Sequence, residues 1–225
     1  MEKLDINIST DIFIKADNFT KFRNDCKEYL ATVDANWDKF TIVSHDSFVG
    51  YITEYLISKH LKNINSTLKI EIWEDQFDLR EIIRVVKDKD YSPVSKALVV
   101  NYFYDKWDIK INNKEVLFLS DVKTALTLKI PNEKWNFMYP VIQANKIGKD
   151  IMILVFYVVS DLKNLKSIQD LYLIGYTTPE TIIKCPIIKA GEKTIYGTTS
   201  QIDNYVTELS KDYFNLNDLL KSMHQ

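Results

Sequence analysis

The sequence predicts a single α/β domain built on a mixed β-sheet that is flanked by helices. Helical patterns dominate the first part of the chain, and β-rich segments follow them. The apolar run Ile151–Val159 has the length and continuity of a fully buried strand. This succession of helices and strands is typical of helices packed on a sheet. A length of 225 residues, with only five Gly and five Pro, fits one large domain without a linker.

The first part of the chain is predicted to hold three helices and one strand. Helical segments are predicted at Asp17–Val33, Ser47–Leu61 and Asp75–Lys89. Asp17 or Asn18 is expected to cap the first helix and Ser47 the second, because short polar side chains accept hydrogen bonds from free backbone N–H groups. Leu68–Trp73 alternates between apolar and polar residues, which indicates a strand. Pro93 is expected to stop the third helix.

The rest of the chain is rich in β-branched and aromatic residues, which favour strands. Strands are predicted at Lys96–Tyr104, Trp107–Ile111, Glu115–Val122, Ile151–Val159 and Leu171–Tyr176. The turn between the second and third of these is predicted at Asn112–Lys114. Asn132–Lys146 is predicted to be a helix that Pro140 kinks or divides. Smaller elements are expected at three places, namely a short helix from Pro179, an extended segment within Lys189–Val206 and a helix at Leu216–Met223.

Composition and charge limit the possible functions. The net charge of −2 is not that of a strongly basic nucleic-acid binder, although a basic face can coexist with acidic residues elsewhere. Cys26 and Cys185 are too few for a disulfide framework or a structural zinc site. The N-terminal segment lacks the apolar core of a signal peptide, and no apolar run is long enough to cross a bilayer. We therefore expect a protein of the reducing cytoplasm without membrane contact.

The predicted hairpin of Trp107–Ile111 and Glu115–Val122 brings together residue types with catalytic uses. Side chains two apart on a strand point to the same face, so Asp121 and Lys123 project together. A hairpin folded through Asn113–Lys114 places Leu119 opposite Asp108, and Asp121 is then the diagonal neighbour of Asp108. Moving the turn by one residue at each end preserves this parity. The sequence therefore predicts that two carboxylates and one ammonium converge.

Each of these groups has a role in phosphodiester hydrolysis. A divalent cation polarises the phosphate and lowers the pKa of an attacking water, and Mg²⁺ prefers oxygen ligands such as Asp108 and Asp121. A nearby ammonium, that of Lys123, can orient the water and offset the charge that develops on phosphate oxygens. Asp-x-Lys alone is common, and a solvated hairpin is the competing interpretation. The apolar run Val116–Leu119 favours catalysis, because it leads straight into these charges.

In this arrangement the sequence resembles the PD-(D/E)xK nuclease superfamily. Its members carry an Asp at the start of one strand and, on the next strand, an Asp or Glu, any residue and a Lys after a hydrophobic run. Asp108 matches the first acid, and Asp121 and Lys123 match the second acid and the lysine. Trp107 stands where the name of the superfamily has Pro. Asp105 is the alternative candidate for the first acid.

The resemblance covers about residues 47–176 and implies a fold, a cofactor and an assembly. The implied fold is a restriction-endonuclease-like mixed sheet flanked by helices, with N-terminal helical and C-terminal appendages around this nuclease core. Members often place an acid on a helix before the first motif, and Glu54 in the helix around Gly50–Leu56 is expected to be this accessory catalytic and metal-binding acid. The implied cofactor is Mg²⁺, for which Mn²⁺ can substitute. A homodimer is an expectation from restriction-type nucleases.

The C-terminal part resembles small DNA nucleases of phage and restriction type. The resemblance lies in the phrase Asp170–Thr181 and in Lys189–Lys193. It favours DNA over RNA as the nucleic-acid partner, and a phage- or virus-encoded protein. Three lysines in this region are expected to contact phosphates, namely Lys184, Lys189 and Lys193.

Two alternatives remain open from the sequence. His45-Asp46-Ser47-Phe48-Val49-Gly50 resembles the His-Asp-x-Phe-Gly phrase of cap-snatching RNA endonucleases of segmented negative-strand RNA viruses, in which the His binds metal. In that interpretation His45 is a metal ligand and RNA is the substrate, although Val49 interrupts the phrase. The other alternative is a nuclease-like fold that only binds nucleic acid or assembles with partners, because fold does not fix function.

Overall fold

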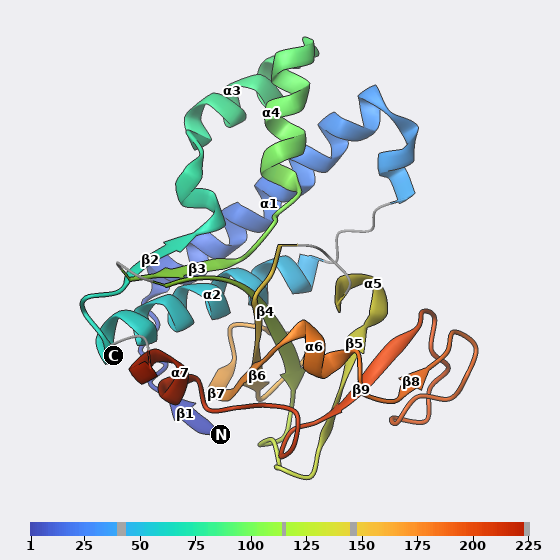
Figure 1. Ribbon diagram of the computed structural model, residues 1–225. Helices are drawn as coiled ribbons and strands as arrows, with labels where there is room; N and C mark the ends of the chain where they lie inside the picture. The colour runs from blue at the N-terminus through green and yellow to red at the C-terminus, as the bar shows by residue number, and fades with distance from the viewer. Residues whose placement is uncertain (40–43, 114–115, 145–147, 223–225) are drawn as a thin grey trace.

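The computed structural model describes residues 1–39, 44–113, 116–144 and 148–222. Within these ranges a six-stranded sheet forms the centre of the molecule (Figure 1). Its strands lie in the order β1 (Glu2–Leu4), β7 (Ile168–Thr177), β6 (Ile151–Val159), β4 (Leu117–Thr127), β3 (Ile109–Asn112) and β2 (Lys69–Ile72). The predicted mixed α/β architecture is therefore confirmed.

The sheet combines antiparallel and parallel pairing around β4. β2, β3 and β4 form an antiparallel meander, whereas β4 and β6 run parallel from Ser120 opposite Ile151 to Thr127 opposite Val158. A parallel pair needs a crossover connection, and residues 128–150 supply it. β6 is buried along its whole length, as its unbroken apolar sequence predicts. The start of β6 consequently lies beside the middle of the hairpin that carries the predicted site.

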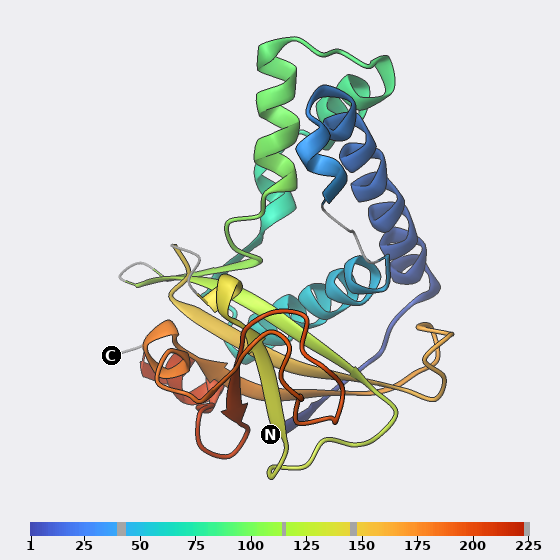
Figure 2. The same cartoon turned by 90° about the vertical axis from the view of Figure 1, so that its right-hand side faces the viewer.

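α2 (Ser44–Ile64) packs against one face of the sheet, where it contacts β2, β4 and β6. α1 (Thr10–Val33) packs on α2, and Figure 2 shows α2 lying directly on the sheet. α2 contributes Ile52 and Leu56 to the main core, and alternate residues of the strands, such as Ile109 and Val122, meet them there. Because side chains alternate along a strand, those of Asp108 and Asp121 point to the opposite face of the sheet. None of the helices in the described ranges is both long enough and apolar enough to span a bilayer.

A second layer of helices stands above the sheet with its own core. α3 (Leu79–Asp88) and α4 (Pro93–Phe103) pack on the C-terminal part of α1, as Figures 1 and 2 show. The short 3-10 helices Ala35–Lys39 and Trp73–Gln76 adjoin this layer. The buried side chains of this core come from several helices, and they are Cys26, Tyr29, Leu30, Trp37, Ile82, Val85, Val99, Tyr102 and Phe103. This layer borders the loop that leads into β3.

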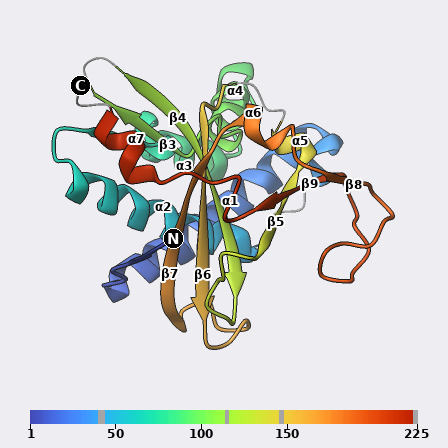
Figure 3. The same cartoon turned by 60° about the horizontal axis from the view of Figure 1, so that its bottom comes forward.

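A small antiparallel sheet covers part of the other face. It consists of β5 (Asn136–Pro140), β9 (Asn204–Glu208) and β8 (Ile187–Ile188), in that order. Figure 3 shows these strands beside β4, with β8 and its loop reaching away from the main sheet. The remaining helices are α5 (Val141–Ala144), α6 (Pro179–Ile182) and α7 (Leu216–Ser222). Buried Tyr139 of β5 lies in the layer between the two sheets.

Two predicted elements are wrong. Lys96–Tyr104 is not a strand: Lys96–Phe103 belongs to α4 and Tyr104 is its C-cap. The helix forms because Ser92 accepts a hydrogen bond from Ser95 N and Pro93 occupies the first turn. The buried side chains of α4 then recur at helical rather than alternating spacing. Asn132–Lys146 is not a continuous helix, because Asn136–Pro140 pairs with β9 and only Val141–Ala144 is helical in its described part.

Several predicted boundaries also need correction. α1 begins at Thr10 with Ser9 at the N-cap, so Asp17 and Asn18 lie inside the helix and do not cap it. α2 begins at Ser44, so Ser47 is in its first turn instead of before it. The other predicted strands and helices are found near their predicted positions, although β4 continues five residues past Val122 and β1 was not predicted. Three predicted positions, Lys114 in the turn, Glu115 and Met223, lie outside the described residues. β1 pairs with β7 and closes that edge of the sheet.

Candidate active site

The β3–β4 hairpin has the predicted parity but a different register. Ile109 pairs with Ser120 and Asn112 with Leu117, whereas the predicted turn would have placed Asp108 opposite Leu119. Asp108 lies just before the paired segment, and its backbone N–H donates to Ser120 O. The prediction was therefore two residues off in register, and an even shift leaves each side chain on its predicted face. Both carboxylates line one pocket, together with Lys123.

Asp121 is the most buried of the charged groups in this pocket, with an exposed fraction of 1%. Its Oδ2 accepts a hydrogen bond from the Tyr139 hydroxyl at 2.6 Å and lies 2.8 Å from Lys123 Nζ. Its Oδ1 forms an ion pair with Lys149 Nζ. Burial raises the pKa of Tyr139, so its hydroxyl stays protonated and remains a donor. Two ammonium groups and one hydroxyl thus hold the Asp121 carboxylate in a fixed orientation.

Asp108 is buried just before β3. Its Oδ2 accepts a hydrogen bond of 2.6 Å from Val122 N, and its backbone N–H donates to Ser120 O. The pKa of Asp108 is raised, first because burial disfavours the charged form and then because the Asp105 charge lies nearby. The positive charges of Lys149 and Lys123 partly oppose this shift. Asp108 is therefore a desolvated carboxylate that a further cation would stabilise.

Lys123 borders the pocket with its ammonium group. Burial lowers the pKa of Lys123, and the charges of Asp108, Asp105 and Glu54 oppose that change. Its side chain is 21% exposed, so it can reach a bound ligand without leaving Asp121. This position fits the predicted role of Lys123 beside the reacting groups.

Two glutamates from different elements complete the acidic wall of the pocket. Glu54 of α2 lies there as predicted, with its Oε1 directed back toward Gly50. The pKa of Glu54 is raised well above its ordinary value, chiefly by burial and next by the Asp108 charge. Glu74 follows β2, and its buried Oε2 has no hydrogen-bond partner in the described structure. Burial also raises the pKa of Glu74. The pocket is thus lined by more carboxyl groups than lysines, and burial disfavours the ionised form of several of them.

The pocket rim contains the alternative candidates. Asp105, the second choice for the first acid, lines the pocket and lies 3.9 Å from Arg23 Nη1. His45, at the start of α2, also lines the pocket but is exposed. Arg23, which also lines the pocket, packs its guanidinium over the ring of Phe103 at 4.9 Å and so joins α1 to α4. All the predicted catalytic and metal-binding residues therefore border one cavity of about 440 Å³.

The donor set suits a hard cation, but the described side chains do not form a ready-made ligand set. Carboxylate oxygens are what Mg²⁺ prefers, and within the described ranges Glu74 Oε2 has no hydrogen-bond partner. The pKa values of Asp108 and Glu54 are raised by burial despite the cations nearby. Among the described residues, however, no three His, Cys, Asp or Glu side chains stand close enough together to hold a metal ion. Asp121 has both oxygens engaged. The residues fit a Mg²⁺ ion in their chemistry, and their side chains must adjust to bind it.

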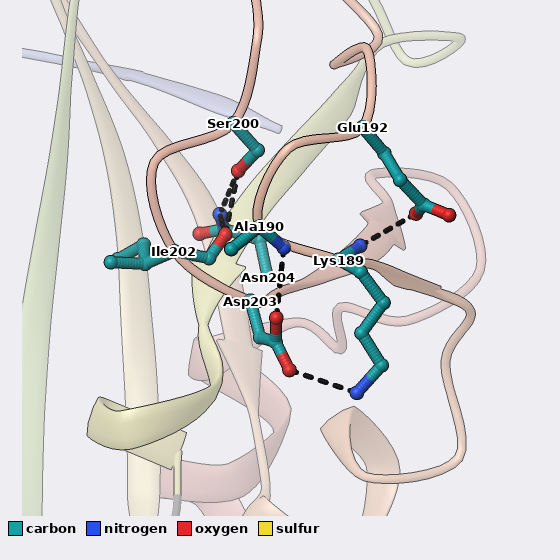
Figure 4. A network of polar contacts seen from close by, with 7 residues as sticks. All are labelled: Lys189, Ala190, Glu192, Ser200, Ile202, Asp203 and Asn204. Atoms are coloured by element: carbon teal, nitrogen blue, oxygen red, sulfur yellow. Dashed lines mark hydrogen bonds and ion pairs between the residues drawn. The ribbon is translucent and has the colours of Figure 1, made fainter.

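The three lysines predicted to contact phosphates lie away from the pocket. Lys184, Lys189 and Lys193 are in the segment between α6 and β9 and are not among the pocket-lining residues. Figure 4 shows Lys189 within a polar network, in which its Nζ lies 2.8 Å from Asp203 Oδ2 and its backbone N–H donates to Glu192 Oε2. The network fixes this loop through internal contacts, which accounts for Lys189 without nucleic acid.

The excess of carboxylates leads to a prediction about stability. Glu54→Gln should raise the melting temperature of the metal-free protein by roughly 2–4 °C, equivalent to about 1 kcal/mol in a chain of this size. The raised pKa of Glu54 means that its ionisation costs folding free energy above that pKa. The gain should therefore be present in mildly alkaline buffer and should vanish as the pH falls toward 4.5, where the wild-type side chain is also protonated. Thermal melts in EDTA at several pH values measure it, and an equal gain at all pH values would contradict the explanation.

Some residues that shape the site were not predicted. They include Glu74, Tyr139, Lys149 and the rim residue Arg23. Glu74 could have been found, since it follows a predicted strand that pairs with the one after Asp108. Tyr139 and Lys149 depend on the contact between the two sheets and on parallel pairing of β4 with β6, for which local sequence carries no signal.

Comparisons with known proteins give no relative from which a role could be transferred. No family model, curated protein or solved structure matches the chain. The chemistry of the pocket is consequently the basis for any statement about function.

Proposed function

We propose that the protein is a metal-dependent nuclease of the PD-(D/E)xK class that hydrolyses phosphodiester bonds, with DNA as its substrate. The observation that carries the proposal is that Asp108, Asp121, Lys123 and Glu54, from three separate elements, line one pocket. A hairpin of solvated charges would not bury Asp108 and Asp121. Buried acids and a lysine whose pKa values are shifted in a cleft are typical of functional sites.

The mixed sheet is consistent with the fold that this class implies. An acid on α2 precedes the meander β2–β3–β4, the first motif acid stands directly before β3, and the second acid and the lysine lie on β4. This is the order that the resemblance requires. We therefore also propose a restriction-endonuclease-like core, to which the helical layer and the small sheet are appendages.

In this proposal each side chain has a defined task. Mg²⁺ held by carboxylates of Asp108, Asp121 and Glu54 would polarise the phosphate and lower the pKa of the attacking water. Lys123 donates hydrogen bonds from its ammonium to that water or to a non-bridging phosphate oxygen. Tyr139 keeps the Asp121 carboxylate oriented through its 2.6 Å hydrogen bond. Glu54, whose pKa is raised, can also accept a proton within the pocket.

RNA is the second candidate substrate, and the position of His45 favours it. His45 lines the same pocket as the acids, as a cap-snatching type of RNA endonuclease would require. Its exposure leaves the imidazole accessible to a cation at the rim. DNA remains the first choice because of the resemblance around Gly175–Glu180 and Lys189–Lys193.

A cleavage assay tests the proposal. Labelled single-stranded DNA, double-stranded DNA and single-stranded RNA are incubated with the protein in Mg²⁺ and, separately, in EDTA. We expect Mg²⁺-dependent cleavage of DNA that Asp108→Asn removes. Asparagine retains an acceptor for Val122 N while it removes the charge, so the hairpin should survive. The matched control is Asp88→Asn, at the exposed end of α3, which should cleave like the wild type.

Other outcomes select the alternatives. Cleavage that is confined to RNA and lost in His45→Ala would assign the protein to the cap-snatching type. Failure to cleave any of the three substrates with Mg²⁺, Mn²⁺ or Co²⁺ would overturn the nuclease proposal in favour of a binding or assembly protein.

A further inference from the structure

Lys149 is a buried lysine that the proposed reaction does not yet use. Its side chain is 4% exposed, compared with 21% for Lys123, and its ammonium pairs with Asp121 Oδ1. The backbone next to it is fixed to β4, because Asp150 N donates to Leu119 O and Leu119 N donates to Asp150 Oδ2. Lys149 therefore enters the pocket on an anchored stem at the start of β6.

The contacts of Asp121 show which position Lys149 occupies. Oδ2 is engaged by Lys123 and Tyr139, and Oδ1 is the oxygen that faces Lys149. The Lys149 charge also acts on Asp108, where it lowers the pKa more than the Lys123 charge does. Lys149 thus places a positive charge near both motif acids, and it takes the Asp121 oxygen that Lys123 and Tyr139 leave free.

A divalent cation at these two acids would need the same oxygen. An ammonium and a metal ion cannot both occupy Asp121 Oδ1 at close range, because like charges repel strongly in a desolvated pocket. A lysine ammonium is a compact charge on a flexible four-carbon stem, so it can leave by side-chain rotation while the backbone stays in place. Lys149 also lines the open cavity, which provides a place for it to move.

We propose that Lys149 is a tethered cation that competes with the metal for Asp121. In the metal-free protein it neutralises Asp121 and stabilises a pocket rich in carboxylates. When the metal binds, Lys149 leaves Oδ1 and turns into the cavity, toward the space where a substrate phosphate would lie. This inference rests on the proposed function, because it assumes a divalent cation at Asp108 and Asp121.

Metal titration and lysine labelling test the competition. Lys149→Met keeps the length of the side chain and removes the charge, while Lys123 still partners Asp121. Calorimetry with Mn²⁺ should show affinity raised roughly tenfold or more, the lower end of the coupling between close charge pairs. The matched control is Lys110→Met, whose ammonium pairs with Glu71 at 3.0 Å outside the pocket, and its affinity should equal that of the wild type.

A second measurement uses the unmodified chain. An amine-reactive ester, read out by mass spectrometry, should label Lys149 slowly without metal and faster in Mn²⁺, because the ammonium moves out of its buried pair. Equal Mn²⁺ affinity in wild type and Lys149→Met, or equal labelling with and without Mn²⁺, would overturn the competition while leaving the nuclease proposal intact. No Mn²⁺ binding by either protein would overturn the metal site itself. If Lys149→Met does not fold, the labelling experiment decides alone.

Discussion

Lys123→Ala should slow cleavage at saturating Mg²⁺ on the order of a hundred- to a thousand-fold, the usual cost of removing one preorganised donor. The ammonium lies 2.8 Å from Asp121 Oδ2 and borders the pocket, so its role is expected where charge accumulates on phosphate oxygens. Lys149 still neutralises Asp121 in this variant, so the fold should be retained. The measurement is single-turnover cleavage of labelled DNA, together with a thermal melt.

Companion variants separate catalysis from structure. Lys123→Arg should restore only part of the rate, because the planar guanidinium cannot reproduce the contacts of a compact ammonium. Lys123→Ala should bind Mn²⁺ at least as tightly as the wild type, since a repelling charge is gone. Cleavage by Lys123→Ala at the wild-type rate would mean that the Asp-x-Lys pattern is an accident of the hairpin. A variant that unfolds would show that Lys123 is a structural residue.

Gly175→Ala should destabilise the fold strongly, although it adds only one methyl group. Gly175 has φ +149°, and a Cβ at this position would lie 2.2 Å from the backbone oxygen of Phe214. That oxygen accepts the hydrogen bond of Tyr176 N in a reciprocal bridge between β7 and the segment before α7. Strain and the loss of this bridge should together cost on the order of 3 kcal/mol.

A melting curve measures this effect. The melting temperature of Gly175→Ala should fall by roughly 6–12 °C, at 2–4 °C per kcal/mol for a chain of this size. The matched control is Gly197→Ala, which also has a positive φ, +80°, but has open space around the added Cβ. It should lose only about 1 kcal/mol from backbone strain. Equal losses in the two variants would show that the close approach to Phe214 is unimportant.

Gly175 also bears on how the resemblance in the C-terminal part is to be understood. It lies next to a bulge in β7, where Leu154 pairs with Gly175 and Val155 pairs with Leu173. Thr178 caps α6 by accepting a hydrogen bond from Thr181 N. Part of the phrase that favours DNA nucleases is therefore explained by the geometry of β7 and α6. This is why the choice of DNA depends on the cleavage assay.

The hairpin site was predictable because its geometry is local. The alternation of side chains along a strand determines that Asp121 and Lys123 share a face, and any even shift in register keeps Asp108 with them. The register itself was off by two residues, since Asn113 and Val116 are joined by hydrogen bonds from Asn113 N to Val116 O and from Val116 N to Asn113 Oδ1. Glu54 was predicted from the resemblance instead, and it reaches the pocket because α2 packs on the sheet.

The errors arise where long-range packing or a cap determines the structure. The segment of α4 has the β-branched and aromatic composition of a strand, but the Ser92 cap and packing on α1 and α3 favour a helix. β5 forms because β9, far away in the sequence, pairs with it. Lys149 reaches Asp121 through the parallel pairing of β4 with β6, which nothing in the local pattern specifies.

Calorimetric titration with Mn²⁺ tests the central claim most directly, because it asks whether the buried acids bind a divalent cation. Wild type and Asp88→Asn should bind Mn²⁺, whereas Asp108→Asn and Asp121→Asn should each abolish binding or weaken it at least tenfold while still giving a cooperative melt. Unchanged Mn²⁺ binding in both folded site variants, or no binding by the wild type, would contradict the assignment of Asp108 and Asp121 as the metal ligands of a nuclease.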